Sequence, residues 1–266
     1  MLVDHADIES YRRDGAVCIR GLLDKAWVGR IISAIDRIEQ EPGPFRERYS
    51  PDDPGMFFSE KFMWTFDRDF RAFVFESGAA ALVGGLMDAT KVNIFYDHLM
   101  VKEPGTVTRT PWHQDLNYWP VEGRQICSLW IPFDPVGLEN GGLEFVSGSH
   151  RWGNRYQPFE FKKTKAVETD EFEPLPDIES RREDLTILSW DLEPGDAVVF
   201  DALILHGACG NTTAASRRRA LSTRWAGDDA RFVRRNKMIR LIRDPGLQPG
   251  DALDCDLFPV IWRRPG

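Results

Sequence analysis

The sequence predicts an α+β protein whose main body is a β-sandwich or a β-barrel. Helical patterns dominate up to about residue 90. From about residue 91 the chain changes to short runs of β-branched and aromatic residues, separated by clusters of glycine and proline. Helices first and then many strands are typical of this fold class.

The chain opens with two helical patterns joined by an apolar run. Residues 6–14 predict a short helix that Gly15 ends, and residues 16–22 form a strand-like run. Asp24 can cap the next helix, because its side chain can accept hydrogen bonds from the free amides of a first turn. Apolar residues then recur at helical spacing, so one face of this helix should lie on the core. They are Trp27, Ile31, Ile32, Ile35 and Ile38.

A polar stretch and two more helices come before the strands. Residues 41–66 are rich in proline, glycine and charge, and we expect an irregular loop over the surface. Helical stretches follow near 67–76 and 78–88. The strand-like runs are Lys91–Val101, Gln125–Phe133, Gly142–Val146, Ala197–Leu205 and Arg219–Trp225.

One domain over residues 1–266 is the expected organisation, because no internal repeat or second linker is visible in the sequence. It divides into a mainly helical flank at 1–90, a strand-rich core at 91–230 and a C-terminal extension at 231–266. Within the core, residues 151–184 form a long polar interruption without clear periodicity. A loop of this length is typical of a lid or a binding segment, and disorder is the alternative.

The composition favours small-molecule chemistry over nucleic-acid binding. The formal net charge is −8 and the pI is near 5.3, so the chain lacks the basic surface that phosphates require. The four cysteines are widely spaced and form no CxxC pair. They are therefore expected to be reduced thiols, not ligands of a zinc ribbon or parts of a disulfide framework.

No secretion or membrane signal is visible in the sequence. Its first ten residues include Asp4, Asp7 and Glu9, where a signal peptide needs a basic start and an apolar run. The sequence contains no stretch of about 18 apolar residues that could span a membrane. We therefore expect a soluble, cytoplasmic protein, and the sequence leaves its oligomeric state open.

Three residues form a candidate metal site. The segment Trp112-His113-Gln114-Asp115 places an imidazole and a carboxylate two residues apart, and in an extended chain such residues point to the same face. The third ligand must come from elsewhere, and among the five histidines His206 is the best candidate. It ends a strand-like apolar run far along the chain, which suits the opposite wall of a barrel.

This set of ligands favours iron(II). Two histidines and one carboxylate on one face of an octahedral ion leave the other face open, as iron(II) enzymes need in order to hold oxygen and a co-substrate. Zinc more often takes a tetrahedral site with three histidines or with cysteines. A HxD triplet is common by chance, so the neighbouring sequence has to support the interpretation.

Several longer segments extend the pattern beyond this triplet. They are Pro111–Pro120, Asn140–Gly153, Glu193–Phe200, Leu205-His206-Gly207 with Asn211, and Arg217–Ser222. In this order they closely resemble the phytanoyl-CoA dioxygenase family. The opening at 6–22 is also similar to the family, whereas 41–90 and 151–184 match it poorly.

The resemblance implies a double-stranded β-helix, or jelly roll, with flanking helices. It also implies an enzyme that uses iron(II), 2-oxoglutarate and O2, and that converts 2-oxoglutarate to succinate and CO2 while it oxidises a small-molecule substrate. By position, His113, Asp115 and His206 match the family's iron ligands.

The family anchors 2-oxoglutarate with an arginine after the distal histidine, and Arg218 matches that position. The spacing from His206 is one residue longer than the commonest pattern, so Arg217 and Arg219 remain alternative anchors of 2-oxoglutarate. A guanidinium suits this task because two parallel hydrogen bonds can hold a carboxylate. Strand alternation turns either Arg218 or its two neighbours inward, and we favour Arg218.

Three further residues match family positions that border the co-substrate. Gln114 lies beside the ligands, Trp130 lies on the next strand, and His98 lies on a strand that corresponds to one lining the family's pocket. An ordinary sheet position is the alternative for Gln114 and Trp130. For His98 the alternative is a structural histidine bonded to a carboxylate.

Hydroxylation is the expected reaction, because related halogenases lack a carboxylate at the position of Asp115. Desaturation and cyclisation on the same centre stay open. Two other classes of protein stay open as alternatives to a dioxygenase. One is a metal-binding, cupin-like isomerase or hydrolase, and the other is a non-catalytic, ligand-binding jelly roll. The family name implies an acyl-CoA, but family members act on many small metabolites, and the sequence does not identify the substrate.

Overall fold

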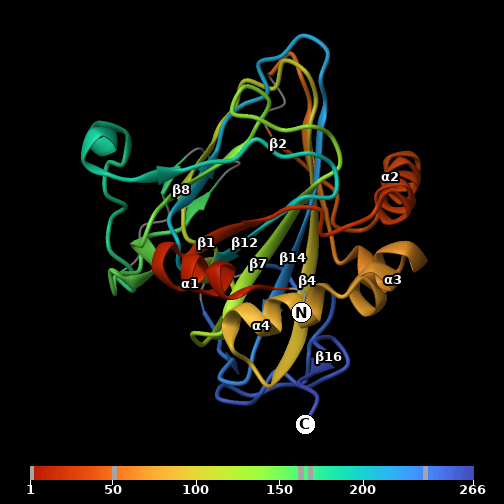
Figure 1. Ribbon diagram of the computed structural model, residues 1–266, viewed down its shortest axis with the longest axis vertical. Coiled ribbons are helices and arrows are strands. Elements are labelled where there is room, and N and C mark those ends of the chain that lie inside the picture. The colour runs from red at the N-terminus through yellow and green to blue at the C-terminus, as the bar shows by residue number, and fades with distance from the viewer. Residues whose placement is uncertain (1–2, 50–52, 161–164, 167–169, 236–238) are drawn as a thin grey trace.

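Two antiparallel sheets face each other in the computed structural model, and helices α2 and α3 lie on one side of them (Figure 1). This is the jelly roll with flanking helices that the family resemblance implies. The structure describes residues 3–49, 53–160, 165–166, 170–235 and 239–266. Residues 50–52 of the predicted loop, and 161–164 and 167–169 of the polar interruption, lie outside the described residues.

The two N-terminal helices lie close to their predicted positions. Helix α1 (His5–Asp14) ends at Gly15, whose φ of 83° is a left-handed conformation that glycine adopts without a steric penalty. At the start of α2 (Lys25–Gln40) the Asp24 side chain accepts a hydrogen bond from the Trp27 amide at 2.8 Å. The buried residues of α2 are Ile31, Ala34, Ile35 and Ile38.

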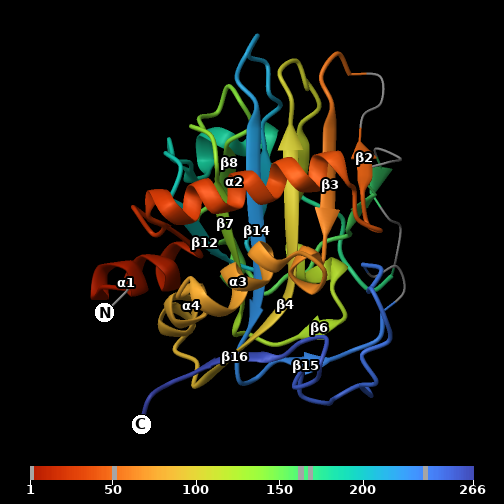
Figure 2. The same cartoon turned by 90° about the vertical axis from the view of Figure 1, so that its right-hand side faces the viewer.

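Helices α2, α3 (Arg68–Glu76) and α4 (Ala79–Met87) cover the outer face of the larger sheet (Figure 2). Their apolar side chains pack on outward-pointing residues of the strands, such as Leu129 and Leu221. Among the described residues no single helix is long and apolar enough to cross a membrane; α3 and α4, bent by 43°, pass that test as a pair on length and composition alone.

The larger sheet has eight strands in the order β1-β12-β7-β14-β4-β3-β2, with β16 paired to β4. Strands from near both ends of the chain therefore share one sheet. Its strands are β1 (Ala16–Ile19), β2 (Glu47–Tyr49), β3 (Phe57–Lys61), β4 (Lys91–Lys102), β7 (Ile126–Pro132), β12 (Ala197–Asp201), β14 (Arg218–Ala226) and β16 (Val260–Arg263).

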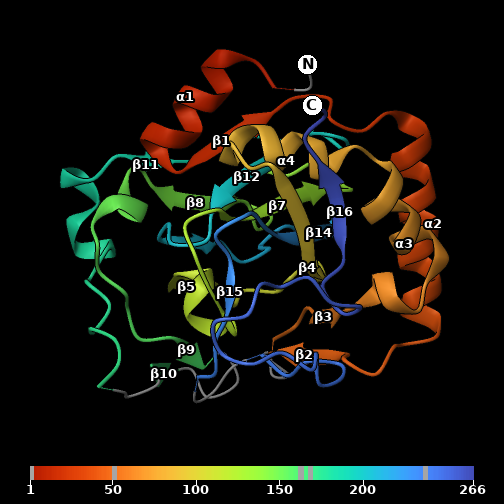
Figure 3. The ribbon, with the colours of Figure 1, turned by 90° about the horizontal axis from the view of Figure 1, so that it is seen from below.

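The smaller sheet has the order β11-β8-β13-β5 and faces the inner side of the larger one (Figure 3). Aromatic side chains between the two sheets, among them Trp130, Phe145 and Phe200, form an inner core. The strands of the smaller sheet are β5 (Thr110–His113), β8 (Leu143–Val146), β11 (Ile187–Leu188) and β13 (His206–Ala208). Two separate pairs are β6 (Val121–Glu122) with β15 (Arg231–Phe232), and β9 (Phe159–Glu160) with β10 (Lys165–Ala166).

The prediction of an irregular loop over residues 41–66 is wrong for much of this segment. It contains β2 and β3, and β3 pairs with β4 before the short 3-10 helix η1 (Met63–Thr65). Phe57 and Phe58 are buried in β3. The flanking prolines and glycines obscured a strand that is too short to show a clear period by itself.

Strand alternation decides which residues of the larger sheet reach the space between the sheets. On β14, Leu221 packs toward the helices, whereas Ala220 belongs to the inner core. Successive residues of a strand point to opposite faces. Arg218, Ser222 and Arg224 therefore share the inner face with Ala220.

Candidate metal centre

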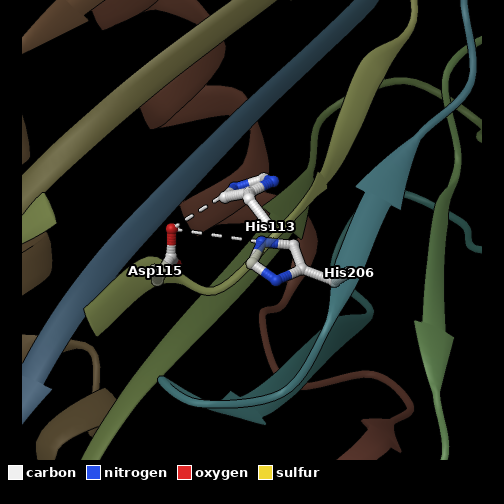
Figure 4. A group of neighbouring side chains, drawn as sticks. All are labelled: His113, Asp115 and His206. Carbon is white, nitrogen blue, oxygen red and sulfur yellow. Dashed lines mark ion pairs between the residues drawn. The ribbon is translucent and has the colours of Figure 1, made fainter. Parts of the chain in front are cut away.

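His113, Asp115 and His206 meet in the space between the two sheets (Figure 4). Each offers one ligand atom, and these atoms all lie within 4.8 Å of one another. Oδ1 of Asp115 is 3.7 Å from Nε2 of His113 and 4.0 Å from Nε2 of His206. All three residues are buried, so their ligand atoms can surround one ion that is shielded from bulk water.

The backbone brings the first two residues together as their spacing predicts. His113 ends β5, and Asp115 begins the 3-10 helix η2 (Asp115–Tyr118). Gln114 between them is extended, which places its two neighbours on the same side of the chain.

The expectation that His206 lies on the opposite wall of the barrel is wrong. β13 pairs with β5, and His206 lies directly across from His113 in the smaller sheet. The apolar run before His206 is not one strand, because β12 ends at Asp201 in the larger sheet and the chain then crosses to the smaller one. The two histidines are thus neighbours on adjacent strands.

Backbone carbonyls fix the orientation of both imidazoles. Nδ1 of His113 is 2.8 Å from the Pro111 carbonyl oxygen, and Nδ1 of His206 is 3.1 Å from that of Ile204. A carbonyl oxygen only accepts, so each Nδ1 carries the proton and each Nε2 keeps a lone pair for a metal. Burial and the nearby His113 lower the pKa of His206 to about 3, which keeps this ring neutral at physiological pH.

Two side chains of the larger sheet hold the other oxygen of Asp115. Oγ of Ser128 donates a hydrogen bond to Oδ2 at 2.8 Å, and Nη2 of Arg224 is 3.5 Å from the same atom. Burial acts to raise the pKa of Asp115, but the positive charge of Arg224 outweighs it and holds this pKa well below its usual range. Asp115 therefore stays ionised, with Oδ1 facing the histidines.

The three consecutive arginines separate by strand face. Arg217 pairs with Glu39 at 2.8 Å and Arg219 approaches Asp36 at 3.6 Å. Both acids belong to α2, which covers the outer face of the sheet. Of the three arginines, Arg218 is the one that points between the sheets.

Arg218 is a buried cation with unused hydrogen-bonding capacity. Its Nη1 donates to the Met100 carbonyl at 3.0 Å, whereas its Nε has no hydrogen-bond partner in the described part of the chain. Its guanidinium lies 5.9 Å from the ring centre of Trp130. Gly141 leaves room for this side chain: its φ is 101°, and a Cβ there would lie 3.1 Å from Nε of Arg218. Burial lowers the pKa of Arg218 to about 10, so the group stays charged at neutral pH.

The residues predicted beside the co-substrate differ in what they offer. Trp130 and His98 lie on the inner face, on the two strands next to β14. Nε2 and Oε1 of Gln114 both form hydrogen bonds within the protein. These bonds favour the interpretation of Gln114 as a structural residue over a contact with the co-substrate. Its hydrogen-bond partners are the Leu203 and Asn154 carbonyls, the Asn117 side chain and the Tyr156 amide.

The alternative for His98 was a structural histidine bonded to a carboxylate. Among the described residues no carboxylate forms such a bond with His98. Its Nε2 atom is buried and has no hydrogen-bond partner among them. Burial, Lys61 and Arg224 hold the pKa of His98 well below its usual range, so the ring is neutral.

Sequence reasoning missed Ser128 and Arg224 as members of this centre. Strand alternation offered a signal for Arg224, because it follows Arg218 at even spacing along one strand. Ser128 carried no signal, since a serine in an apolar strand is an ordinary sheet residue until its partner is known.

A family model described as phytanoyl-CoA dioxygenase (PhyH) matches residues 11–220. The chain belongs to the phytanoyl-CoA dioxygenase family. It is 31% identical over 163 residues to a probable phytanoyl-CoA dioxygenase of Caenorhabditis elegans, which covers 59% of this chain and 50% of the relative. It is 28% identical over 150 residues to the peroxisomal phytanoyl-CoA dioxygenase of Homo sapiens, which covers 54% and 43%. The chain thus spans about half the length of these relatives.

A solved structure of similar fold is that of the epimerase SnoN in complex with Fe3+, α-ketoglutarate and nogalamycin RO. Its TM-score is 0.77 at 21% identity, over 97% of this chain and 98% of that one. At this identity the likeness shows the shared fold. Phytanoyl-CoA dioxygenases use iron(II), 2-oxoglutarate and O2, and the two Nε2 atoms and one carboxylate oxygen described above are a donor set that fits this iron.

Proposed function

We propose that this phytanoyl-CoA dioxygenase family member is an iron(II)- and 2-oxoglutarate-dependent dioxygenase. It hydroxylates a small-molecule metabolite and converts 2-oxoglutarate to succinate and CO2. One observation carries the proposal: the buried atoms Nε2 of His113, Oδ1 of Asp115 and Nε2 of His206 face a common point, on the same side of the larger sheet as the buried Arg218.

In this proposal His113, Asp115 and His206 hold the iron. When bound, iron(II) supplies open coordination positions and the redox chemistry with O2 that oxidises a C–H bond. The carbonyl partners of the two Nδ1 atoms keep the imidazoles in the tautomer that binds metal. Ser128 and Arg224 keep Oδ1 of Asp115 directed at the same point.

Arg218 binds the distal carboxylate of 2-oxoglutarate in this proposal. A planar guanidinium can hold a carboxylate through two parallel hydrogen bonds, and its Nε has no other partner in the described chain. The two sheets exclude water from this contact, which strengthens it. Trp130 packs beside the guanidinium and limits its movement.

The remaining expectations concern the chain as a whole. One domain over residues 1–266, a cytoplasmic location and a small metabolite as substrate stay predictions. The acidic composition supports a small molecule over nucleic acid. The oligomeric state and the identity of the metabolite stay open.

Turnover of 2-oxoglutarate tests this function. Purified protein with iron(II), ascorbate, O2 and a metabolite extract should form succinate, and mass spectrometry should find a metabolite that has gained one oxygen. Asp115→Ala and His206→Ala should each lower the rate of succinate formation by more than about 100-fold. This exceeds the roughly 10- to 100-fold loss that is typical when a residue hydrogen-bonded to a metal ligand is removed. The exposed His5 offers the control His5→Ala, which should keep full turnover. Wild-type rates in the Asp115 and His206 variants, or no succinate from iron-loaded protein, would refute the proposal.

A further inference from the structure

Ser222 is a buried polar residue whose hydroxyl group has no partner. Its exposed fraction is 0%, and its Oγ makes no hydrogen bond to any described residue. A buried hydroxyl without a partner lowers the stability of the folded chain, because it has lost its hydrogen bonds to water. Such a group is a candidate for contact with a bound ligand.

The position of Ser222 relates it to both functional groups already described. It lies on the inner face of β14, between Arg218 and Arg224. Arg224 is the residue whose Nη2 is 3.5 Å from Asp115. Ser222 therefore lies along the strand between the co-substrate's arginine and the metal ligands.

The cross-strand neighbours of Ser222 are Trp130 on β7 and His98 on β4. Side chains directly opposite each other in antiparallel strands have Cβ atoms roughly 4.5–5.5 Å apart. Nε2 of His98 is buried and, like Oγ of Ser222, lacks a hydrogen-bond partner among the described residues. Two neighbouring polar groups thus face the same space, and neither satisfies the other.

Arg218 adds a third such atom on this face, because its Nε also lacks a partner within the described chain. A ligand with several acceptor oxygens would satisfy all three atoms at once. A carboxylate oxygen only accepts, so the serine hydroxyl and the neutral imidazole would both act as donors to it.

We propose that Ser222 and His98 form a polar pair that binds 2-oxoglutarate between Arg218 and the metal, with Oγ of Ser222 donating a hydrogen bond to the co-substrate. This inference rests on the proposed function and adds to it a binding residue, Ser222. It also assigns a partner to the unpaired Nε2 of His98.

Binding of 2-oxoglutarate without turnover tests the pair. Protein loaded with Mn(II) in place of iron is titrated with 2-oxoglutarate by calorimetry, and thermal unfolding of the metal-free protein is measured beside it. Ser222→Ala should weaken binding by about 10- to 100-fold, the range of a hydrogen bond to a charged group. Its metal-free melting temperature should stay the same or rise, because the variant removes an unsatisfied hydroxyl. His98→Leu should weaken binding in the same assay.

Thr223→Val is the matched control, since Thr223 is the next residue and points to the outer face. Its Oγ1 accepts a hydrogen bond from Nε1 of Trp225 at 2.8 Å, so this variant should lower the melting temperature and leave 2-oxoglutarate binding unchanged. The inference is overturned if Ser222→Ala binds 2-oxoglutarate like the wild type, or if it lowers the melting temperature as Thr223→Val does. Absence of binding by the wild type would instead refute the proposed function on which the inference rests.

Discussion

Three neighbouring arginines show how the environment of each side chain, more than its chemistry, decides what a residue does. Arg217 pairs with Glu39 of α2, and Arg219 pairs with Asp134 and approaches Asp36 of α2. The charges of both are thus paired outside the space between the sheets. Arg218 faces the inner core and keeps an unpaired Nε within the described chain. A buried cation of this kind needs an anion, and the distal carboxylate of 2-oxoglutarate is the anion that we propose.

Substitution of the two arginines should therefore have different effects. Arg218→Met should weaken 2-oxoglutarate binding by about 30-fold or more, because loss of one partner of a buried, hydrogen-bonded charge pair costs roughly 2–5 kcal/mol. Arg217→Met removes two partly exposed ion pairs, with Glu39 and Glu103, and should change the free energy of unfolding by about 1 kcal/mol without affecting binding. Calorimetric titration of the Mn(II)-loaded variants measures both affinities. Equal affinities for the two variants would exclude Arg218 as the anchor.

Sequence reasoning reached the residues whose chemistry is distinctive. Residue type and spacing suggested the triad, and the family resemblance supported it. The same resemblance pointed to an arginine after the distal histidine, and we favoured Arg218 over its two neighbours by alternation along the strand. Ser128 and Ser222 could not be found in this way, because their importance depends on which atoms lie opposite them. Ser128 matters through its contact with Asp115, and Ser222 through the lack of any partner among the described residues.

At the scale of elements, the described parts of the 151–184 segment are attached to the metal-binding motif. Nε1 of Trp112 donates to Glu179 at 2.8 Å, and Nδ2 of Asn117 donates to the Tyr156 carbonyl at 2.7 Å. Residues that flank the proposed iron ligands thus hold this segment beside the site. These contacts support the interpretation of the segment as a cover or binding element.

Glu144 provides a second attachment of this segment and a way to test its role. Glu144 is buried on β8 and accepts hydrogen bonds from Arg182 of the 3-10 helix η5 (Glu179–Asp184) at 2.5 Å and from Arg109 at 3.0 Å. Glu144→Gln keeps the shape but removes the charge, so η5 should detach more often. Both arginines are partly exposed, and we therefore expect an effect of only about 1 kcal/mol, or roughly a fivefold faster tryptic cleavage within η5.

The control for this cleavage experiment is Glu183→Gln, which changes an exposed residue of the same helix. It should leave the cleavage rate at the wild-type value. If both variants were cleaved at the same rate as the wild type, Glu144 would not hold the segment in place.

Helices and strands were predicted best where the element is long and its apolar residues recur at a regular spacing. Helix α2 and strand β4 lie close to their expected bounds, and Asp24 caps α2 as expected. The prediction failed for β3, a short strand between prolines and glycines, and for the run before His206. A run of apolar residues does not reveal where the chain leaves one sheet for the other, because both sheets bury apolar side chains.

For the molecule as a whole, the jelly roll assembles the centre from both sheets. The smaller sheet brings the two histidines together through the pairing of β5 with β13. The larger sheet supplies Ser128 and Arg224, which hold Asp115. The centre therefore depends on how the two sheets face each other, and a bound metal should stabilise that arrangement by mass action.

The C-terminal extension also belongs to this architecture, although the family model ends at residue 220. Leu253, Leu257 and Phe258 are buried, and β16 pairs with β4. The extension thus packs on the strand that carries His98, and its apolar residues close one part of the core.

Iron content after anaerobic loading tests the central claim most directly. The wild type, loaded with iron(II), desalted and analysed by mass spectrometry of the metal, should retain about one iron per chain, as one mononuclear site requires. His113→Ala, Asp115→Ala and His206→Ala should each lose most of it while keeping the wild-type circular dichroism spectrum. His150→Ala changes a histidine outside the triad and should keep the iron. Full iron content in the three triad variants would contradict the account.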